Sequence, residues 1–217
     1  MVDIQKQRSL FSDNDESDLF FYERRLYAKS CYSIAGIDEA GRGPLAGPVV
    51  AAAVILPRGV DLPGVDDSKK LAEAKRDKLF TEIMGKALAV GVGKAEADEI
   101  DEINILQATL KAMKRAVDSL SITPDYLLID GINTIKKDIP QEAIKKGDSR
   151  SISIAAASII AKVTRDRLMV ELDKQFPAYG FASHKGYGSK THREAIASCG
   201  PVSAHRKSFA GVKEHVK

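Results

Sequence analysis

Cysteine is scarce in this chain. Its 217 residues include two, Cys31 and Cys199, which lie far apart and form no Cys-x-x-Cys motif. A disulfide framework or a cysteine-rich metal site needs more cysteines at closer spacing. We therefore expect both residues to be reduced thiols with a structural role.

Long apolar stretches are absent as well. No run approaches the roughly 20 residues that a membrane-spanning helix requires, and residues 1–25 lack the uninterrupted apolar centre of a signal peptide. The chain is nevertheless long enough to bury the core of one domain. These features predict a cytoplasmic protein without a membrane partner, and we expect it to be a monomer.

Positive and negative charges are unevenly distributed along the chain. Residues 1–110 carry 14 basic and 19 acidic side chains, whereas residues 111–217 carry 19 basic and 11 acidic ones. All four histidines lie between positions 184 and 215. A basic half is typical of proteins that bind a polyanion, but it is also typical of an ordinary solvated surface, so charge alone leaves both interpretations open.

Alternating hydrophobic patterns predict an α/β domain. We expect residues 1–18, which are polar and acidic, to be loose. The predicted strands are 33–38, 48–56, 87–93 and 126–130; the predicted helices are 18–30, 66–87 after an Asp/Ser cap, 95–120 as one broken or two consecutive helices, and 151–176. A glycine- and histidine-containing loop at 179–192, a short helix and a polar tail follow. Three successive strands, with later strands separated by helices, indicate a mixed sheet.

A glycine-rich turn follows the first predicted strand. Residues 41–46 match G-x-G-x-x-G/A, but a dinucleotide site needs a helix opening at the last position, and here prolines flank a strand-forming run. The Walker motif is excluded because no Lys-Ser or Lys-Thr follows. Two interpretations remain. Gly41 and Gly43 let backbone N–H groups approach a phosphate or sugar beside Arg42, or the turn is merely tight and Arg42 points to water.

Acidic residues end two of the predicted strands. Asp38 and Glu39 close the first, Asp130 closes the fourth, and Asp148 precedes the long helix, where it either caps the first turn or reaches the other acids. If the strands are neighbours, these carboxylates repel by several kcal/mol unless a divalent cation neutralises them. Oxygen ligands without a cysteine or histidine cluster favour Mg²⁺ or Mn²⁺. Two such ions about 4 Å apart suit attack of water on a phosphodiester.

Taken together and in order, the motifs resemble bacterial ribonuclease HII. They are GIDEAGRGPLAGPVVAAAVIL, DDSKKL, EIDEINIL, LLIDG, KGDSRSISIAAASIIAKVTRD, YGFASHKGYGSKTH and HRKSF, spread between about residues 34 and 213, whereas residues 131–140 match no family pattern. The resemblance implies a ribonuclease H-like fold: a mixed five-stranded sheet flanked by helices. It further implies a catalytic domain over 31–217, with a helical extension at about 180–217, after a polar segment and lead-in helix at 1–30.

The resemblance also implies the activity and its metal ligands. The expected reaction is endonucleolytic cleavage of RNA in RNA/DNA hybrids, together with incision on the 5′ side of a single ribonucleotide in duplex DNA, leaving 3′-hydroxyl and 5′-phosphate ends. The family's four metal-site acids fall on Asp38, Glu39, Asp130 and Asp148. They imply two-metal-ion hydrolysis with Mg²⁺ or Mn²⁺.

Substrate-binding residues follow from the same resemblance. The family's glycine-arginine-glycine motif falls on Gly41, Arg42 and Gly43, which are expected to contact the 2′-hydroxyl and adjacent phosphates through backbone groups. Tyr187 matches the tyrosine that stacks on the deoxyribose after the ribonucleotide. The other candidates for phosphate contact are Ser158, Lys162 and Arg165 on one face of the long helix, Lys69 with Lys70, His184 with Lys185, and Arg206.

Two other functions remain open at this point. One is another two-metal nuclease or polynucleotidyl transferase of the same fold, such as a junction resolvase or a hybrid-specific ribonuclease H. Tyr187 and the glycine-arginine-glycine turn argue against that alternative. The other is a non-catalytic module that binds hybrids, against which the four intact acids argue.

Overall fold

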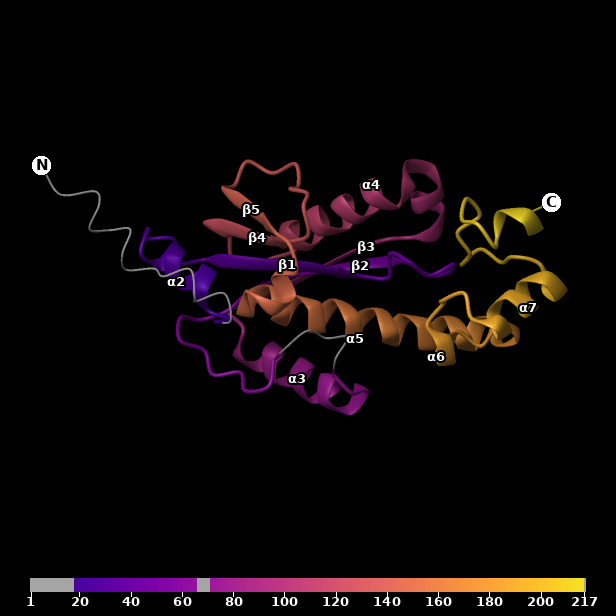
Figure 1. Cartoon of the computed structure of the whole chain (residues 1–217), viewed down its shortest axis with the longest axis horizontal. Coiled ribbons are helices and arrows are strands. Elements are labelled where there is room, and N and C mark those ends of the chain that lie inside the picture. The colour runs from indigo at the N-terminus through magenta and orange to yellow at the C-terminus, as the bar shows by residue number, and fades with distance from the viewer. Residues whose placement is uncertain (1–17, 66–70, 217) are drawn as a thin grey trace, which may run out of the picture.

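The computed structural model describes residues 18–65 and 71–216 (Figure 1). Most of the segment expected to be loose, residues 1–17, lies outside the described residues, and so do Lys69 and Lys70. In the two described ranges, no helix combines the length and apolar character needed to cross a membrane.

A mixed five-stranded sheet forms the centre of the molecule. Its strand order is β3-β2-β1-β4-β5, and β2 (Val49–Ile55) is antiparallel to both of its neighbours, β1 (Ile34–Ala40) and β3 (Ala89–Ala95). Strands β4 (Tyr126–Asp130) and β5 (Gln141–Ile144) run parallel to β1. The sheet confirms the expected fold class.

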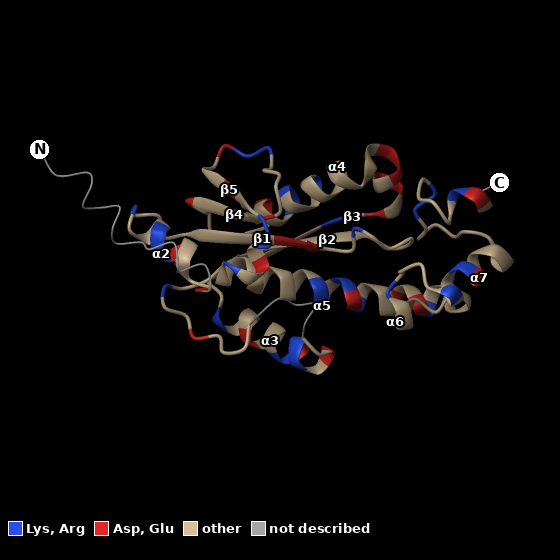
Figure 2. Ribbon diagram, viewed as in Figure 1, with Lys and Arg blue, Asp and Glu red and all other residues tan. Residues whose placement is uncertain are grey.

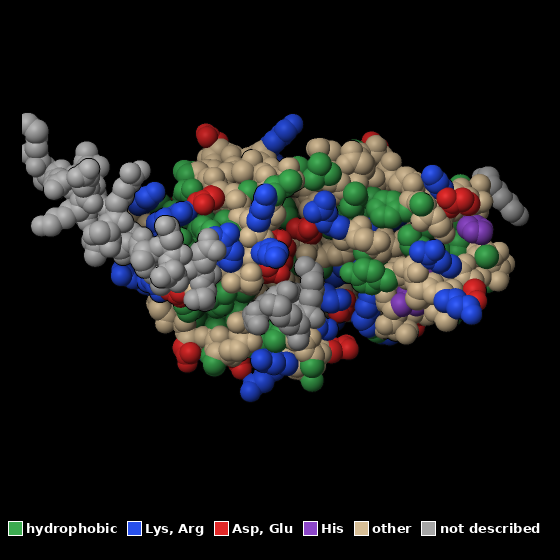
Figure 3. Space-filling view, in the orientation of Figure 1, with side chains coloured by type: hydrophobic (Ala, Val, Ile, Leu, Met, Phe, Trp, Pro, Cys, Tyr) green, Lys and Arg blue, Asp and Glu red, His purple; other side chains and the backbone are tan. Residues whose placement is uncertain are grey.

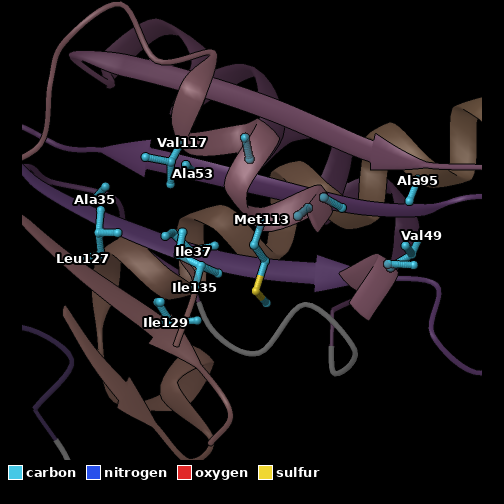
Figure 4. Close-up of a cluster of buried hydrophobic side chains, with 14 of the residues drawn as sticks. Ala35, Ile37, Val49, Ala53, Ala95, Met113, Val117, Leu127, Ile129 and Ile135 are labelled. Carbon is cyan, nitrogen blue, oxygen red and sulfur yellow. The ribbon is translucent and has the colours of Figure 1, made fainter. Parts of the chain in front are cut away.

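Helices cover both faces of the sheet (Figure 1). Helix α4 (Ala97–Asp118) packs on one face, and α3 (Glu73–Lys86) and α5 (Ile152–Gln175) pack on the other. Figure 4 shows part of the core under α4, where Met113 and Val117 lie against side chains of the strands. Close packing on the opposite face requires a glycine in β1: a Cβ at Gly36 would lie 2.1 Å from the backbone of Ser153, so α5 could not approach β1 as closely.

Several element boundaries differ from the expected ones. Strand β5 falls in a stretch expected to be a connection; it is a short, half-exposed edge strand and therefore needs no apolar alternation. Helix α3 begins at Glu73 without a side-chain cap, and the expected Asp/Ser signal at 66–68 lies outside the described residues. Strand β3 ends at Ala95, two residues later than predicted.

The expected break in the helix at 95–120 is confirmed. Asn104 has a left-handed backbone, with a φ of 68°, in the middle of α4. Its side-chain Oδ1 accepts hydrogen bonds from the N–H groups of Leu106 and Gln107. Asn104 therefore restarts the helix in the manner of an N-cap.

Segments at both ends of the described chain pack on this core. Helix α2 (Phe21–Tyr27) lies at the start of α5, where the carboxylate of Glu23 accepts hydrogen bonds from Ser151 Oγ and Ser153 N. At the far end of α5, the short helices α6 (Phe181–His184) and α7 (Lys190–Cys199) and residues up to 216 pack around Phe181 and Ile196. This C-terminal part also contacts the turn after β1 through Leu45.

Candidate active site

The register of two parallel strands brings the acids together. Ile37 of β1 pairs with Ile129 of β4, so the next residues, Asp38 and Asp130, lie side by side at the same end of neighbouring strands. Asp38 is buried, at 3% exposure. Strand β1 continues to Ala40, so Asp38 and Glu39 lie within the strand and do not close it. Figure 2 shows this acidic stretch in the middle of the molecule, with basic segments of α5 below it.

Asp148 lies next to this pair. The N–H of Gly147 donates a 2.7 Å hydrogen bond to Asp130 Oδ1, and Asp148 itself is buried in the single 3-10 turn Gly147–Ser149. The N-cap of α5 is Ser151, whose Oγ accepts a hydrogen bond from Ile154 N at 3.3 Å. Ser151 therefore fills the N-cap position, which was one of the two alternatives for Asp148.

Burial and neighbouring carboxylates disturb the ionisation of Asp38. Burial, followed by the charges of Glu39 and Asp130, raises the pKa of Asp38 well above its usual range. Hydrogen bonds from Ser158 and from Glu39 N partly offset this effect. A cation at this position would relieve the repulsion.

The donor set fits a hard divalent cation. All four candidate side chains offer carboxylate oxygens, which Mg²⁺ and Mn²⁺ prefer. Throughout residues 18–65 and 71–216, no group of three or more His, Cys, Asp or Glu side chains is arranged closely enough to hold a metal ion by itself. Mg²⁺ commonly takes one or two carboxylates and completes its shell with water and substrate phosphate. The open arrangement therefore suits an ion that is held jointly by the protein and a phosphodiester.

A pocket of about 310 Å³ adjoins the acids. Its lining joins β1, the glycine turn, α5 and the loop after α6, through Glu39, Ala40, Gly41, Arg42, Gly43, Ser158, Lys162, Arg165 and Tyr187. The half-exposed ring of Tyr187 faces Gly43: a Cβ at Gly43 would lie 3.9 Å from its Cε1. Residues predicted from three separate motifs thus line one pocket.

A second, smaller hollow of about 170 Å³ is also lined by Glu39. It is lined by Arg42, Asp130 and the apolar face of α4 at Leu110 and Met113. Arg42 is half-exposed, and its Nη1 lies 3.4 Å from Glu39 Oε1. Figure 3 shows acidic side chains near the middle of this face with basic ones on both sides, which suits a polyanion crossing the acids.

Two of the expected phosphate contacts are corrected by the structure. Arg165 and Arg206 are 1% and 0% exposed, and their guanidinium groups donate to backbone carbonyls of the protein. Arg206 uses all five of its N–H donors in this way, and Arg165 uses three, so both side chains hold the protein's own backbone rather than extending from the surface towards a phosphate.

The remaining basic candidates have protein partners too. Lys162 Nζ pairs with Asp166 at 2.7 Å but still lines the pocket. His184 donates from Nε2 to the carbonyl of Tyr179, and its Nδ1 accepts from Gly186 N. Lys185 Nζ donates to Ala182 O. His184 and Lys185 therefore shape the loop around Tyr187.

A histidine pair that sequence reasoning missed supports the same loop. Val202 N donates to Nδ1 of His205, so the proton of His205 lies on Nε2 and is donated to Nε2 of His192 at 3.1 Å. His192 consequently carries its proton on Nδ1 and donates it to the carbonyl of Tyr187 at 2.9 Å. Both rings must be neutral for this chain to form. The spacing of His192 and His205 in the sequence gives no indication of this hydrogen-bond chain.

Acid should therefore destabilise the fold through His205. Burial, followed by the nearby His192, lowers the pKa of His205 from 6.5 to about 4. As the pH falls from 6.5 to 4, His205 of the unfolded chain binds a proton, whereas His205 of the folded chain stays neutral. The free energy of unfolding therefore drops, by at most about 3 kcal/mol. Urea unfolding at pH 7.5 and 4.5 measures this drop, which should shrink in His205→Gln. An unchanged pH dependence would exclude His205 as its source.

Comparison with known proteins agrees with these observations. A family model described as Ribonuclease HII matches residues 35–212. The ribonuclease HII of Geobacter metallireducens (strain ATCC 53774 / DSM 7210 / GS-15) is 64% identical over 207 residues, covering 95% of this chain and 97% of the relative. The crystal structure of ribonuclease H2 from Pyrococcus horikoshii OT3 is similar with a TM-score of 0.70 at 28% identity, covering 84% of this chain and 96% of that one. Bst-RNase HIII in complex with Mn²⁺ shares the fold at 20% identity, with a TM-score of 0.64 and coverage of 85% and 69%.

Proposed function

Since the chain belongs to the ribonuclease HII family and is an endoribonuclease that acts on RNA/DNA hybrids, we propose that it also incises duplex DNA on the 5′ side of a single embedded ribonucleotide. Water adds to the phosphorus and the bond to the upstream 3′ oxygen breaks. The products carry a 3′-hydroxyl and a 5′-phosphate.

In this proposal, Asp38, Glu39, Asp130 and Asp148 hold divalent cations, either Mg²⁺ or Mn²⁺. When bound, such ions activate the attacking water and stabilise the leaving oxygen. The protein's own part is to fix the carboxylates on a rigid sheet. The mutual repulsion at Asp38 supports this assignment, as does the Mn²⁺ complex of Bst-RNase HIII, which has the same fold.

Recognition falls to the glycine turn and Tyr187. The backbone at Gly41, Arg42 and Gly43 contacts the 2′-hydroxyl, which distinguishes RNA from DNA regardless of the base. Tyr187 stacks on the following deoxyribose. The observation that carries this proposal is the shared pocket: Glu39, the turn and Tyr187 line one cavity, so the ribose would be read beside the phosphate that is cut.

A strand-labelled DNA duplex with one ribonucleotide tests the proposal. We expect a single cut 5′ to the ribonucleotide in Mg²⁺ or Mn²⁺ and no product in EDTA, because the carboxylates alone cannot activate water. An RNA/DNA hybrid serves as the positive control and an all-DNA duplex as the negative control. Cutting of the hybrid but not of the single-ribonucleotide duplex would refute the proposal and leave the family activity intact. Cutting of all-DNA, or full activity in EDTA, would refute the mechanism.

A further inference from the structure

Two buried arginines lie behind the turn formed by residues 41–48, called here the reading loop. Arg165 comes from α5 and Arg206 from the C-terminal part, and both are almost fully inaccessible. A buried cation is normally paired with a carboxylate. Within the described part of the chain, neither arginine forms an ion pair, and burial lowers the pKa of both. Their charges must be stabilised in another way.

Arg206 is stabilised by the carbonyls of the reading loop. Its Nη2 donates to Gly41 O at 2.5 Å and to Gly47 O at 2.9 Å, and its Nη1 donates to Arg42 O and Pro44 O, both at 2.8 Å. Its Nε also donates to Gly47 O, at 3.1 Å. One guanidinium thus gathers four carbonyl oxygens of a single turn.

Arg165 holds the end of the same loop. Its Nε donates to Pro48 O at 3.0 Å, and its Nη2 donates to Ala46 O at 3.2 Å. Its Nη1 donates to Lys185 O at 3.0 Å, which ties the loop to the segment carrying Tyr187. Gly41 leaves room for this side chain: it has a φ of +97°, and a Cβ there would lie 2.0 Å from Arg165 Nε.

The direction of these carbonyls fixes the direction of the N–H groups. In a planar trans peptide, the C=O of one residue and the N–H of the next point in opposite directions. The carbonyls of Gly41 and Arg42 point inward to Arg206, so the N–H groups of Arg42 and Gly43 point outward. Among the described residues, these two N–H groups have no hydrogen-bond acceptor. They are two adjacent free donors on the surface.

We propose that the two buried arginines are positioning residues for ribonucleotide recognition: by holding the loop's carbonyls inward, they present the N–H groups of Arg42 and Gly43 to the substrate. This inference rests on the proposed function, because it assigns a cause to the geometry of the reading loop. A lysine cannot replace either arginine, since an ammonium lacks the planar fork that reaches several acceptors at once.

The test compares the affinity of the full chain for two duplexes that differ by one 2′-hydroxyl. Ca²⁺ replaces Mg²⁺, and a gel verifies that the duplexes stay intact. The ratio of the two dissociation constants is the discrimination. We expect Arg206→Lys to lower it by about tenfold, the effect of one misplaced hydrogen bond, with the affinity for all-DNA unchanged. A loss of folded protein would weaken both affinities equally and leave the ratio intact.

Two further variants sharpen the comparison. Arg165→Lys should lower the discrimination in the same direction, so the inference is testable even if Arg206→Lys folds poorly. Arg167→Lys is the matched control: it lies on the same helix, is exposed and pairs with Asp77. Discrimination equal to wild type in a folded lysine variant of either buried arginine would overturn the inference. Absence of discrimination in the wild type would instead refute the proposed function.

Discussion

Replacing Asp38 with asparagine is expected to reduce cleavage of an RNA/DNA hybrid by about 10³-fold or more while leaving the protein at least as stable. The charge proposed to hold a cation would be lost, and metal ions contribute several kcal/mol of transition-state stabilisation. Stability should hold or rise because the buried carboxylate is repelled by Glu39 and Asp130, as its raised pKa indicates. Initial rates and thermal unfolding of the same preparations measure both effects.

Asp130→Asn provides the companion experiment on the neighbouring strand, with the same expected loss of activity. Asp77→Asn is the matched control, because Asp77 is exposed, lies in α3 and is paired with Arg167. A variant of Asp38 that cleaves at the wild-type rate would remove it from the metal site. A marked fall in the unfolding temperature of Asp38→Asn would show that the repulsion between Asp38 and the neighbouring carboxylates is already relieved in the wild-type protein.

The fold could be predicted where apolar periodicity is strong. The run YLLID gave β4 at the observed bounds, because a strand buried on both faces is almost wholly apolar. The edge strand β5 lacks that signal, since three of its four residues are half-exposed and only Ile144 is buried. Pairing with β4 determines its structure, and pairing between distant segments leaves no local mark in a sequence.

The convergence of the acids could be predicted, and the role of the arginines could not. A carboxylate directly after several apolar residues stands out against the apolar pattern of a strand, so Asp38 and Asp130 were recognisable from local pattern alone, although only Asp130 ends its strand and β1 continues to Ala40. Arg165 was correctly placed on the helical face that also carries Ser158 and Lys162. Its burial depends on the C-terminal part folding back over the reading loop. Residue type indicates charge, but burial depends on tertiary packing.

The ring of Tyr187 is separable from the backbone that carries it. The backbone N–H donates to His184 O at 2.9 Å, and the carbonyl accepts from His192. The ring itself is half-exposed over the pocket, opposite Gly43. Removing the ring therefore leaves the loop's hydrogen bonds in place, and exposed side chains of this kind contribute little to stability.

Tyr187→Ala should consequently impair cleavage at a single ribonucleotide more than cleavage of a long RNA/DNA hybrid. Stacking on an aromatic ring is worth about 1–3 kcal/mol, which corresponds to a loss of roughly 10- to 100-fold in kcat/KM at the RNA-to-DNA junction. A long hybrid offers many cut sites that do not require a deoxyribose beneath the ring. Tyr187→Phe is the control and should retain the preference, because stacking needs the ring and not the hydroxyl. Equal losses on both substrates in Tyr187→Ala would mean that Tyr187 contributes to binding of the duplex but does not distinguish the RNA-to-DNA junction.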